Sequence, residues 1–307
     1  VAWSMLAVTT AVAAKEVRVT TPHQFIEAIA SETTIIVSGD VHNLTDAAGR
    51  STDSVSWQDF GDGQAPVITG VYDLTIRGES GATLVGEPRF NDVITFRECE
   101  SVTIENLTIG HTVAAEGCMG GVIRFADCTA MVVRGSDLYG SGTHGIACEF
   151  SFDIRIEETA IHDCTIGAVS SFKTIGLSAT DSRFVSNHGY ELFGLYDTYC
   201  VELTNCLVAD NAGEVMFALR ADPGDVTISG CDFRENRISS FSDPSDFINV
   251  DESNSFEGNG FEPPVAAGSD VLPGETQVIQ VRDVVSLYEA IGSNRVIEVL
   301  PGRYNLT

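Results

Sequence analysis

The sequence predicts an all-β protein, a right-handed parallel β-helix with a short N-terminal capping α-helix. The first observation is a repeat in which polar and apolar residues alternate, as in a strand with one buried face. The second is its length of about 24 residues, too short for one copy to enclose a core, so that copies must stack. A leucine-rich repeat has this length, but its leucine pattern is missing. The last apolar residue of each copy, at steps of 29, 23, 23, 24 and 25 residues, is Ile109, Leu138, Ile161, Phe184, Val208 and Phe233.

Polar residues that recur at one position of the repeat are the third observation. Asn187, Asn211 and Asn236 each follow an apolar position by three residues, so we expect a ladder of stacked amides inside one turn. Acidic residues next to these positions (Asp163, Asp210 and Glu235) are expected in turns. The eight cysteines lie between positions 99 and 231 without metal-ligand spacing, which predicts buried free thiols and not a disulfide framework.

The start of the repeat region predicts the capping helix. Thr21 suits an N-cap, Pro22 the first helical position and Gln24 a capping box. Phe25, Ile26 and Ile29 form one apolar face, which would cover the open end of the stack and protect its strand edges.

An internal duplication sets the expected domain boundaries. Residues 17–45 align without gaps to 279–307, an offset of 262. We therefore predict a signal-peptide remnant and a β-helix domain, then a Gly- and Pro-rich linker and the truncated start of a second β-helix unit. Their ranges are 1–14, 15–258, 259–276 and 277–307.

Composition limits the partners. The chain has 17 basic and 44 acidic residues among 307, a net charge of −27, which repels nucleic acids and anionic membranes. Apart from the apolar N-terminal residues, no segment approaches the roughly 20 apolar residues of a membrane helix. We expect an exported, monomeric protein, secreted or at the cell surface.

Several segments resemble bacterial members of the pectate-lyase-like superfamily: Asp73–Gly78, Gly110–Thr112, Gly120–Val122 and Asp137–Thr143. The resemblance implies the same parallel β-helix over about residues 17–258 and a polysaccharide as partner. It does not specify an activity, because lyases, hydrolases, epimerases, accessory proteins and adhesins share this fold. The catalytic signatures of polygalacturonases, pectate lyases and alginate epimerases are absent from the sequence.

Outward-facing neighbours of the apolar positions give the candidate site. Tyr139 and His162 would be adjacent, while Asp137 and Arg183 would lie two coils apart, about 9.6 Å. The longest insertion, which contains His111 and Glu116, would rise beside them as a wall. His144 is expected to border the same side, and these three residues are the candidates for substrate binding.

The residue types of this patch suit β-elimination from a uronic acid. Arg183, or Ca²⁺ held by Asp137, would neutralise the substrate carboxylate, and Tyr139 or His162 would remove the adjacent proton. Hydrolysis by two carboxylates, for which Asp163 and Asp210 have an admissible spacing, is an alternative.

Three functions remain open on the sequence. The first is lyase-type or hydrolytic cleavage of a polysaccharide. The second is a non-catalytic surface, adhesion or carbohydrate-binding module in a tandem protein, which the duplication favours. The third is a periplasmic accessory protein of the copper-handling kind, although the sequence has only 4 Met and 6 His.

Overall fold

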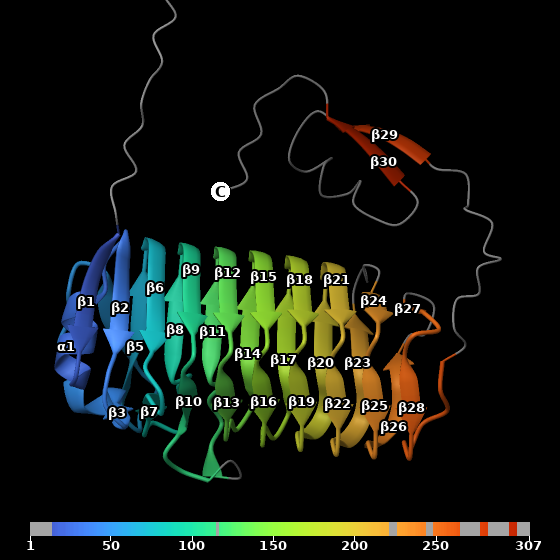
Figure 1. Cartoon of the computed structure of the whole chain (residues 1–307), viewed down its shortest axis with the longest axis horizontal. Helices are drawn as coiled ribbons and strands as arrows, with labels where there is room; N and C mark the ends of the chain where they lie inside the picture. Colours follow the sequence, from blue (N-terminus) through green and yellow to red (C-terminus); the bar gives the residue numbers. More distant parts are fainter. Residues whose placement is uncertain are drawn as a thin grey trace, which may run out of the picture.

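A computed structural model of the chain confirms the predicted fold class, a solenoid of parallel strands with one short α-helix at its beginning (Figure 1). The rungs lie side by side along one axis, and three sheets, here called A, B and C, form the walls. The structure describes residues 14–114, 117–220, 226–243 and 248–264, together with the backbone of 277–281 and 295–299.

Sheet A contains ten strands, and sheets B and C contain nine each. Sheet A is formed by β1 (Lys15–Val19), β2 (Thr33–Val37), β6 (Tyr72–Gly78), β9 (Glu100–Glu105), β12 (Thr129–Arg134), β15 (Phe152–Glu157), β18 (Ile175–Thr180), β21 (Tyr199–Thr204), β24 (Val226–Ser229) and β27 (Ile248–Val250). Sheet B is formed by β3 (Val41–Asn43), β7 (Thr83–Gly86), β10 (Thr108–His111), β13 (Asp137–Tyr139), β16 (Ala160–His162), β19 (Arg183–Val185), β22 (Leu207–Ala209), β25 (Asp232–Arg234) and β28 (Ser255–Glu257). Sheet C is formed by β4 (Val55–Asp59), β5 (Gln64–Thr69), β8 (Ile94–Arg97), β11 (Ile123–Ala126), β14 (His144–Glu149), β17 (Gly167–Phe172), β20 (His188–Tyr196), β23 (Ala212–Arg220) and β26 (Arg237–Asp243).

The apolar positions that define the repeat pair with one another in sheet B. Ile109 pairs with Leu138, Leu138 with Ile161, and Ile161 with Phe184, and the same register continues to β25. Each of these side chains is buried. The repeat spacing read from the sequence is therefore the rung spacing of the solenoid.

The corner between sheets B and C contains the predicted asparagine ladder. Asp163 and Asp210 adopt left-handed backbone conformations at this corner, with φ of 55° and 57°, so they are turn residues as expected. The Oδ1 atom of Asn211 accepts from both the backbone N (2.9 Å) and Nδ2 (3.1 Å) of Asn187. The Nδ2 atom of Asn211 donates to Asn236 in turn. The ladder satisfies backbone groups that the solenoid buries at every turn.

The cysteines are free thiols, as the sequence predicts. All eight lie within the described residues, and only Cys200 is exposed. Cys206 and Cys231 occupy the same corner of adjacent rungs, where the backbone N of Cys206 donates to the Cys231 sulfur (3.3 Å). The seven buried thiols thus fill interior positions as small apolar groups.

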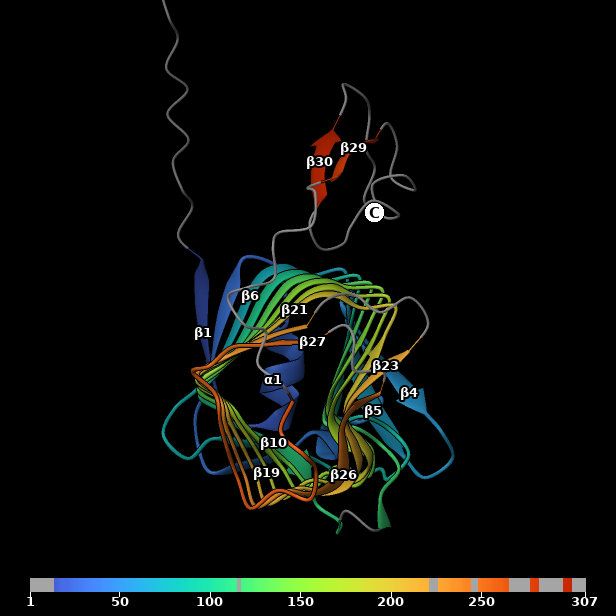
Figure 2. The ribbon, with the colours of Figure 1, turned by 90° about the vertical axis from the view of Figure 1, so that its right-hand side faces the viewer.

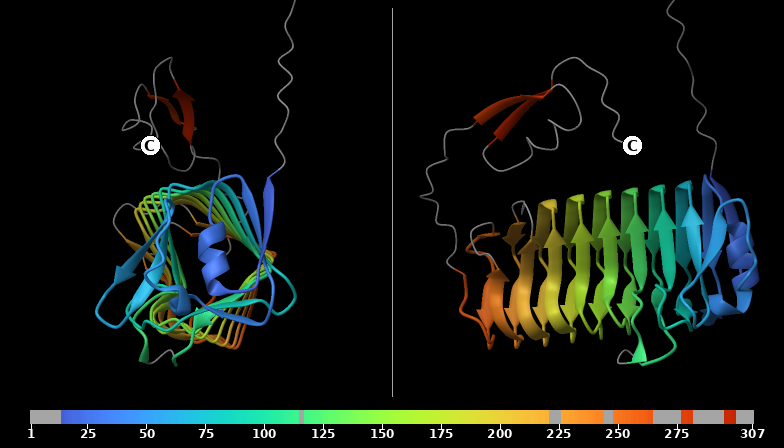
Figure 3. Two further views of the ribbon diagram at one scale, coloured as in Figure 1. Left: turned by 90° about the vertical axis from the view of Figure 1, so that its left-hand side faces the viewer. Right: turned by 180° about the vertical axis from the view of Figure 1, so that it is seen from behind.

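The helix α1 (Pro22–Ala28) covers the first rungs. Figure 2 and the left view of Figure 3 look along the axis of the solenoid and show the helix at its end. Thr21 Oγ1 accepts from the backbone N of Gln24 (3.2 Å), as an N-cap does. The reciprocal bond reaches Thr20 and not Thr21, because Gln24 Oε1 accepts from the Thr20 backbone N (2.8 Å). Phe25 and Ile26 of this helix are fully buried against the core. The 3₁₀ helix η1 (Leu44–Ala47) comes later in the chain, directly after β3.

The last two described strands repeat the pairing of the first two. β29 (Gln277–Val281) pairs with β30 (Arg295–Val299), so that Gln277 lies opposite Arg295. In β1 and β2, Lys15 lies opposite Thr33. Both members of the second pairing precede those of the first by 262 residues (277 − 15 = 295 − 33). This register is the one that the internal duplication requires. The domain boundaries stay a prediction, and most of the expected signal-peptide remnant (1–13) and of the linker (265–276) lies outside the described residues.

Candidate functional site

The predicted patch forms on the outer face of sheet B. Asp137, Tyr139 and His162 face outward on β13 and β16, in the register expected. The Tyr139 and His162 rings are stacked, with centroids 6.0 Å apart. His162 Nε2 lies 3.0 Å from Asp137 Oδ1, and its Nδ1 lies 2.6 Å from Asp163 Oδ2. The sequence therefore predicted the neighbours correctly but not the contact with Asp163.

These contacts work against a role as proton acceptor. The hydrogen bond with Asp137, assisted by Asp163, raises the pKa of His162 to about 9, so the ring is an imidazolium at neutral pH. Burial and the charge of Asp137 raise the pKa of Tyr139, which makes its phenolate scarce. The catalytic assignment of these two residues stays a prediction that their electrostatics do not favour.

The other sequence candidates are dispersed. Arg183 is exposed on β19, one rung beyond His162. His111 is almost fully buried, with Nε2 2.9 Å from the Gly121 carbonyl. This contact anchors the loop between β10 and β11, and His111 also lines a groove on sheet B, so its role in substrate binding stays a prediction. Glu116 lies outside the described residues.

His144 is the largest correction. It was expected to border the sheet B patch, but it lies at the start of β14, on the outer face of sheet C. The physical reason is the corner after β13, where the chain leaves sheet B and enters sheet C in the six-residue step from Leu138 to His144.

Calcium binding by Asp137 was tested against the donor set. Within the described ranges, no three or more His, Cys, Asp or Glu side chains are arranged to hold a metal ion. Asp137 instead accepts a hydrogen bond from His162. The residues of this patch do not fit a Ca²⁺ site, and no chemical step below depends on one.

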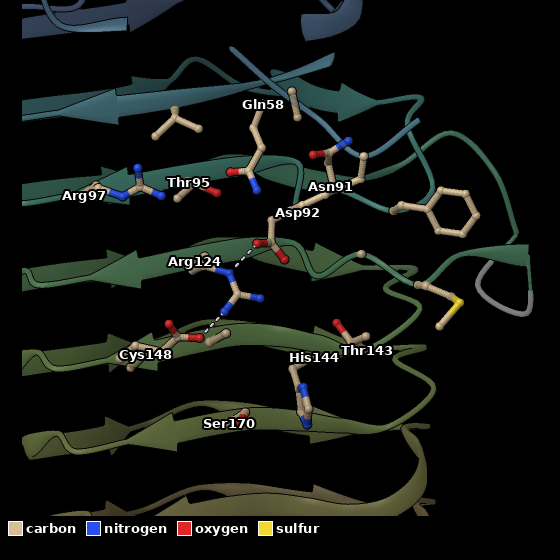
Figure 4. A pocket seen from close by; sticks show the side chains of 18 of the residues that line it. Gln58, Asn91, Asp92, Thr95, Arg97, Arg124, Thr143, His144, Cys148 and Ser170 are labelled. Carbon is tan, nitrogen blue, oxygen red and sulfur yellow. Dashed lines mark hydrogen bonds and ion pairs between the residues drawn. The ribbon is translucent and has the colours of Figure 1, made fainter. Parts of the chain in front are cut away.

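A groove of about 450 Å³ lies on the outer face of sheet C (Figure 4). Large exposed apolar side chains (Phe60, Phe90 and Met119) form part of its rim. Its floor includes the small residues Ala147 and Ser170. The groove thus combines apolar edges with the polar centre described next, as ligand sites commonly do.

Arg124 is the centre of the groove. Its Nε lies 2.6 Å from Asp92 Oδ2, and its Nη1 forms a short ion pair with Glu149. Figure 4 shows the guanidinium beside Asp92, with its remaining nitrogen directed into the groove. Gly121 makes room for Asp92, because a Cβ there would lie 2.5 Å from Asp92 Oδ1. Arg124 is therefore a fixed cation on the groove floor.

His144 lies one rung beyond Arg124. It is the first residue of β14, and Ala147 of that strand pairs with Arg124 of β11. Burial, and after it the charge of Arg124, lower the pKa of His144 to about 4. The Nε2 atom is buried and has no hydrogen-bond partner within the described residues. A neutral imidazole and a guanidinium therefore line the same groove, in contrast to the imidazolium of His162 on sheet B.

Sequence reasoning missed this groove because it followed the strands of sheets A and B. In several strands of sheet C the inward-facing residues begin with two consecutive buried positions, such as Val93-Ile94 and Val122-Ile123, which break the simple alternation. The residue before each pair faces outward, and this rule would have found Asp92 and His144.

Comparisons with known proteins agree with the architecture. The family model described as right handed beta helix region matches residues 92–261. No curated protein matched the chain in sequence. Among solved structures, a pectate lyase from Paenibacillus sp. 0602 is similar with a TM-score of 0.56 and 8% identity, over 80% of this chain and 78% of that one. A pectin methylesterase mutant in complex with a hexasaccharide has a TM-score of 0.53 and 11% identity, over 79% and 86%. Similarity at such identities shows the fold alone.

Proposed function

Because the chain belongs to the right-handed β-helix family, we propose that it acts on a polysaccharide that lies in the groove of sheet C. The pectate lyase and the hexasaccharide-bound pectin methylesterase with similar folds support this substrate class. The observation that carries the proposal is that one open groove is lined by both a fixed guanidinium, Arg124, and a neutral imidazole, His144.

The reaction that this pair supports best is β-elimination. A base removes the proton next to the sugar carboxyl group, the bond to the glycosidic oxygen one carbon further breaks, and a carbon–carbon double bond forms. The departing oxygen takes a proton from water. His144 would accept the first proton, and Arg124 would donate a hydrogen bond to the carboxyl oxygen on which negative charge develops.

Hydrolysis is less well supported. It needs one carboxylic acid that can protonate the departing oxygen. Asp92 and Glu149 are both ion-paired with Arg124, so neither is free to deliver a proton. Asp163 and Asp210, the pair considered from the sequence, are corner residues.

Charge favours an esterified uronate as the substrate. The net charge of −27 repels a polyanion, whereas a methyl ester removes the substrate charge and suits the apolar rim. The ester group also withdraws electrons and so makes the adjacent proton more acidic, and it needs no cation to neutralise it. For an unesterified polymer, any Ca²⁺ would have to be bound mainly by the substrate carboxylates, because the described residues form no cluster that could hold the ion.

The test follows ultraviolet absorbance of unsaturated products. The protein is incubated with methyl-esterified pectin, polygalacturonate and alginate, each with Ca²⁺ or with chelator. We expect absorbance to rise with esterified pectin in both conditions. If reducing ends accumulate without absorbance for any polymer, the reaction is hydrolysis and not elimination. If neither absorbance nor new reducing ends appear, the protein does not cleave these polymers.

A non-catalytic binding module is the second candidate. The register of β29 and β30, which repeats that of β1 and β2, favours a tandem arrangement in which several units bind one polymer. Retention of the protein on these polymers without product would support this alternative. Export and a monomeric state belong to either proposal.

Among the described residues, no helix has the length and apolarity needed to cross a bilayer.

A further inference from the structure

We infer that the outer face of sheet B carries a second, non-catalytic binding site for an uncharged or esterified pyranose unit. The inference rests on the proposed action on polysaccharide and adds a site outside the groove of sheet C. A separate groove of about 670 Å³ lies here. The two grooves share no lining residue.

Tyr139 is the platform of this site. Its ring lies over Gly110 of the preceding rung, where a Cβ would come within 2.5 Å of Tyr139 Cε1. The ring is also stacked with His162, and the part of it that these neighbours leave uncovered lines the groove. An aromatic ring held in place across a sheet provides the apolar surface on which the apolar face of a pyranose can rest.

Apolar side chains continue this platform. Val41 is 64% exposed and lines the groove together with Val85. Thr112 and Val113, at the start of the loop between β10 and β11, line it as well. The same loop supplies Met119 to the groove of sheet C, so it separates the two grooves at the corner of the solenoid.

Of the polar groups near the site, Asp163 lines the groove itself, and it is connected through His162 to Asp137, which lies outside the lining. Asp137 and Asp163 each bind His162 through one oxygen, and their second oxygens remain as acceptors at positions fixed by the His162 ring. Two carboxylates and one imidazolium leave a net negative charge. A sugar with free hydroxyl groups and no carboxylate is the complementary ligand, because an anionic sugar would be repelled. Fixing the acceptors before binding lowers the ordering cost of association.

The experiment measures retardation of the protein in native gels that contain methyl-esterified pectin. Tyr139→Ala is expected to weaken binding about tenfold, a loss of roughly 1.4 kcal/mol, while Tyr139→Phe, which keeps the ring, retains it. Val185→Ala is the matched control, because Val185 faces outward two rungs further on the same sheet. Circular dichroism melting verifies that each variant is folded.

The outcomes separate this site from the proposed function. Weaker binding of Tyr139→Ala with unchanged turnover of a short oligosaccharide supports a non-catalytic second site. Tyr139-dependent binding without any turnover by the wild type would contradict the catalytic proposal and leave the site standing. Equal binding of Tyr139→Ala and wild type, or no retardation of the wild type, would overturn the site. Loss of turnover by a folded Tyr139→Phe would make Tyr139 catalytic and overturn it as well.

Discussion

At the scale of single residues, His162 and His144 show how position on the solenoid decides the charge of a histidine. His162 lies between two carboxylates, which raise its pKa to about 9. His144 lies in a more enclosed place next to Arg124, and its pKa falls to about 4. Only the second is uncharged at neutral pH and therefore has a ring nitrogen without a proton. This difference, more than residue type, is why we locate the chemistry on sheet C.

The stability of the protein should report the charge of His162. The folded pKa of about 9 exceeds the unfolded value of about 6.5. The interaction is therefore fully stabilising below about pH 6.5, and its contribution is lost as pH rises through about 9. Unfolding midpoints of wild type and His162→Gln, measured from about pH 6 to about pH 10, should converge toward the alkaline end. A constant difference across this range would contradict the ion pairing.

At the scale of elements, the corners hold the rungs in register. Asn211 has no exposed surface and bonds to both neighbouring rungs. Its Nδ2 also donates to the Phe184 carbonyl (2.9 Å). Removing the amide would leave buried backbone groups without partners, which costs more than the hydrogen bonds contribute when formed.

Asn211→Ala should lower the free energy of unfolding by about 2–5 kcal/mol. Asn249→Ala, at an exposed position of sheet A, should change it by less than about 0.5 kcal/mol. Urea denaturation of both variants measures the difference. Equal effects would mean that the ladder does not stabilise the solenoid.

The same elements explain how far the sequence could be read. The 24-residue period, the asparagine ladder and the capping helix are local patterns, and each predicted its structure. The outward-facing residues of sheet C were not predicted, because in several of its strands two successive residues face inward, as at Val93-Ile94. Candidate residues on sheet B were therefore placed correctly, whereas Asp92 and Arg124 were missed and His144 was assigned to the wrong face. The ion pairs of Arg124 join three rungs, and such contacts depend on rotamers that spacing does not specify.

At the scale of the whole molecule, the charge of −27 acts on any anionic polymer before it reaches a groove. Its field extends about 30 Å at 0.01 M salt and about 8 Å at 0.15 M. Local features of the groove cannot remove this repulsion, so substrate choice belongs to the entire surface.

Ionic strength should consequently change KM for polygalacturonate and leave that for methyl-esterified pectin nearly constant. Raising salt from about 10 mM to about 150 mM screens the repulsion, and KM for the charged polymer should fall severalfold. Initial rates over this range provide the measurement, with potassium and sodium salts compared as a control for specific ions. A parallel response of both polymers would show that net charge does not select the substrate.

The central claim, that the chemistry takes place on sheet C, is tested most directly by two matched arginine variants. Arg124→Gln removes the arginine that is ion-paired with Asp92 and Glu149 in the groove on sheet C, where Arg97 remains. Arg183→Gln removes the exposed arginine of the sheet B patch. With methyl-esterified pectin, the account predicts that Arg124→Gln lowers the rate of unsaturated-product formation by about 10²–10³-fold, while Arg183→Gln keeps the wild-type rate. Loss of the rate in Arg183→Gln, with Arg124→Gln folded and active, would contradict it.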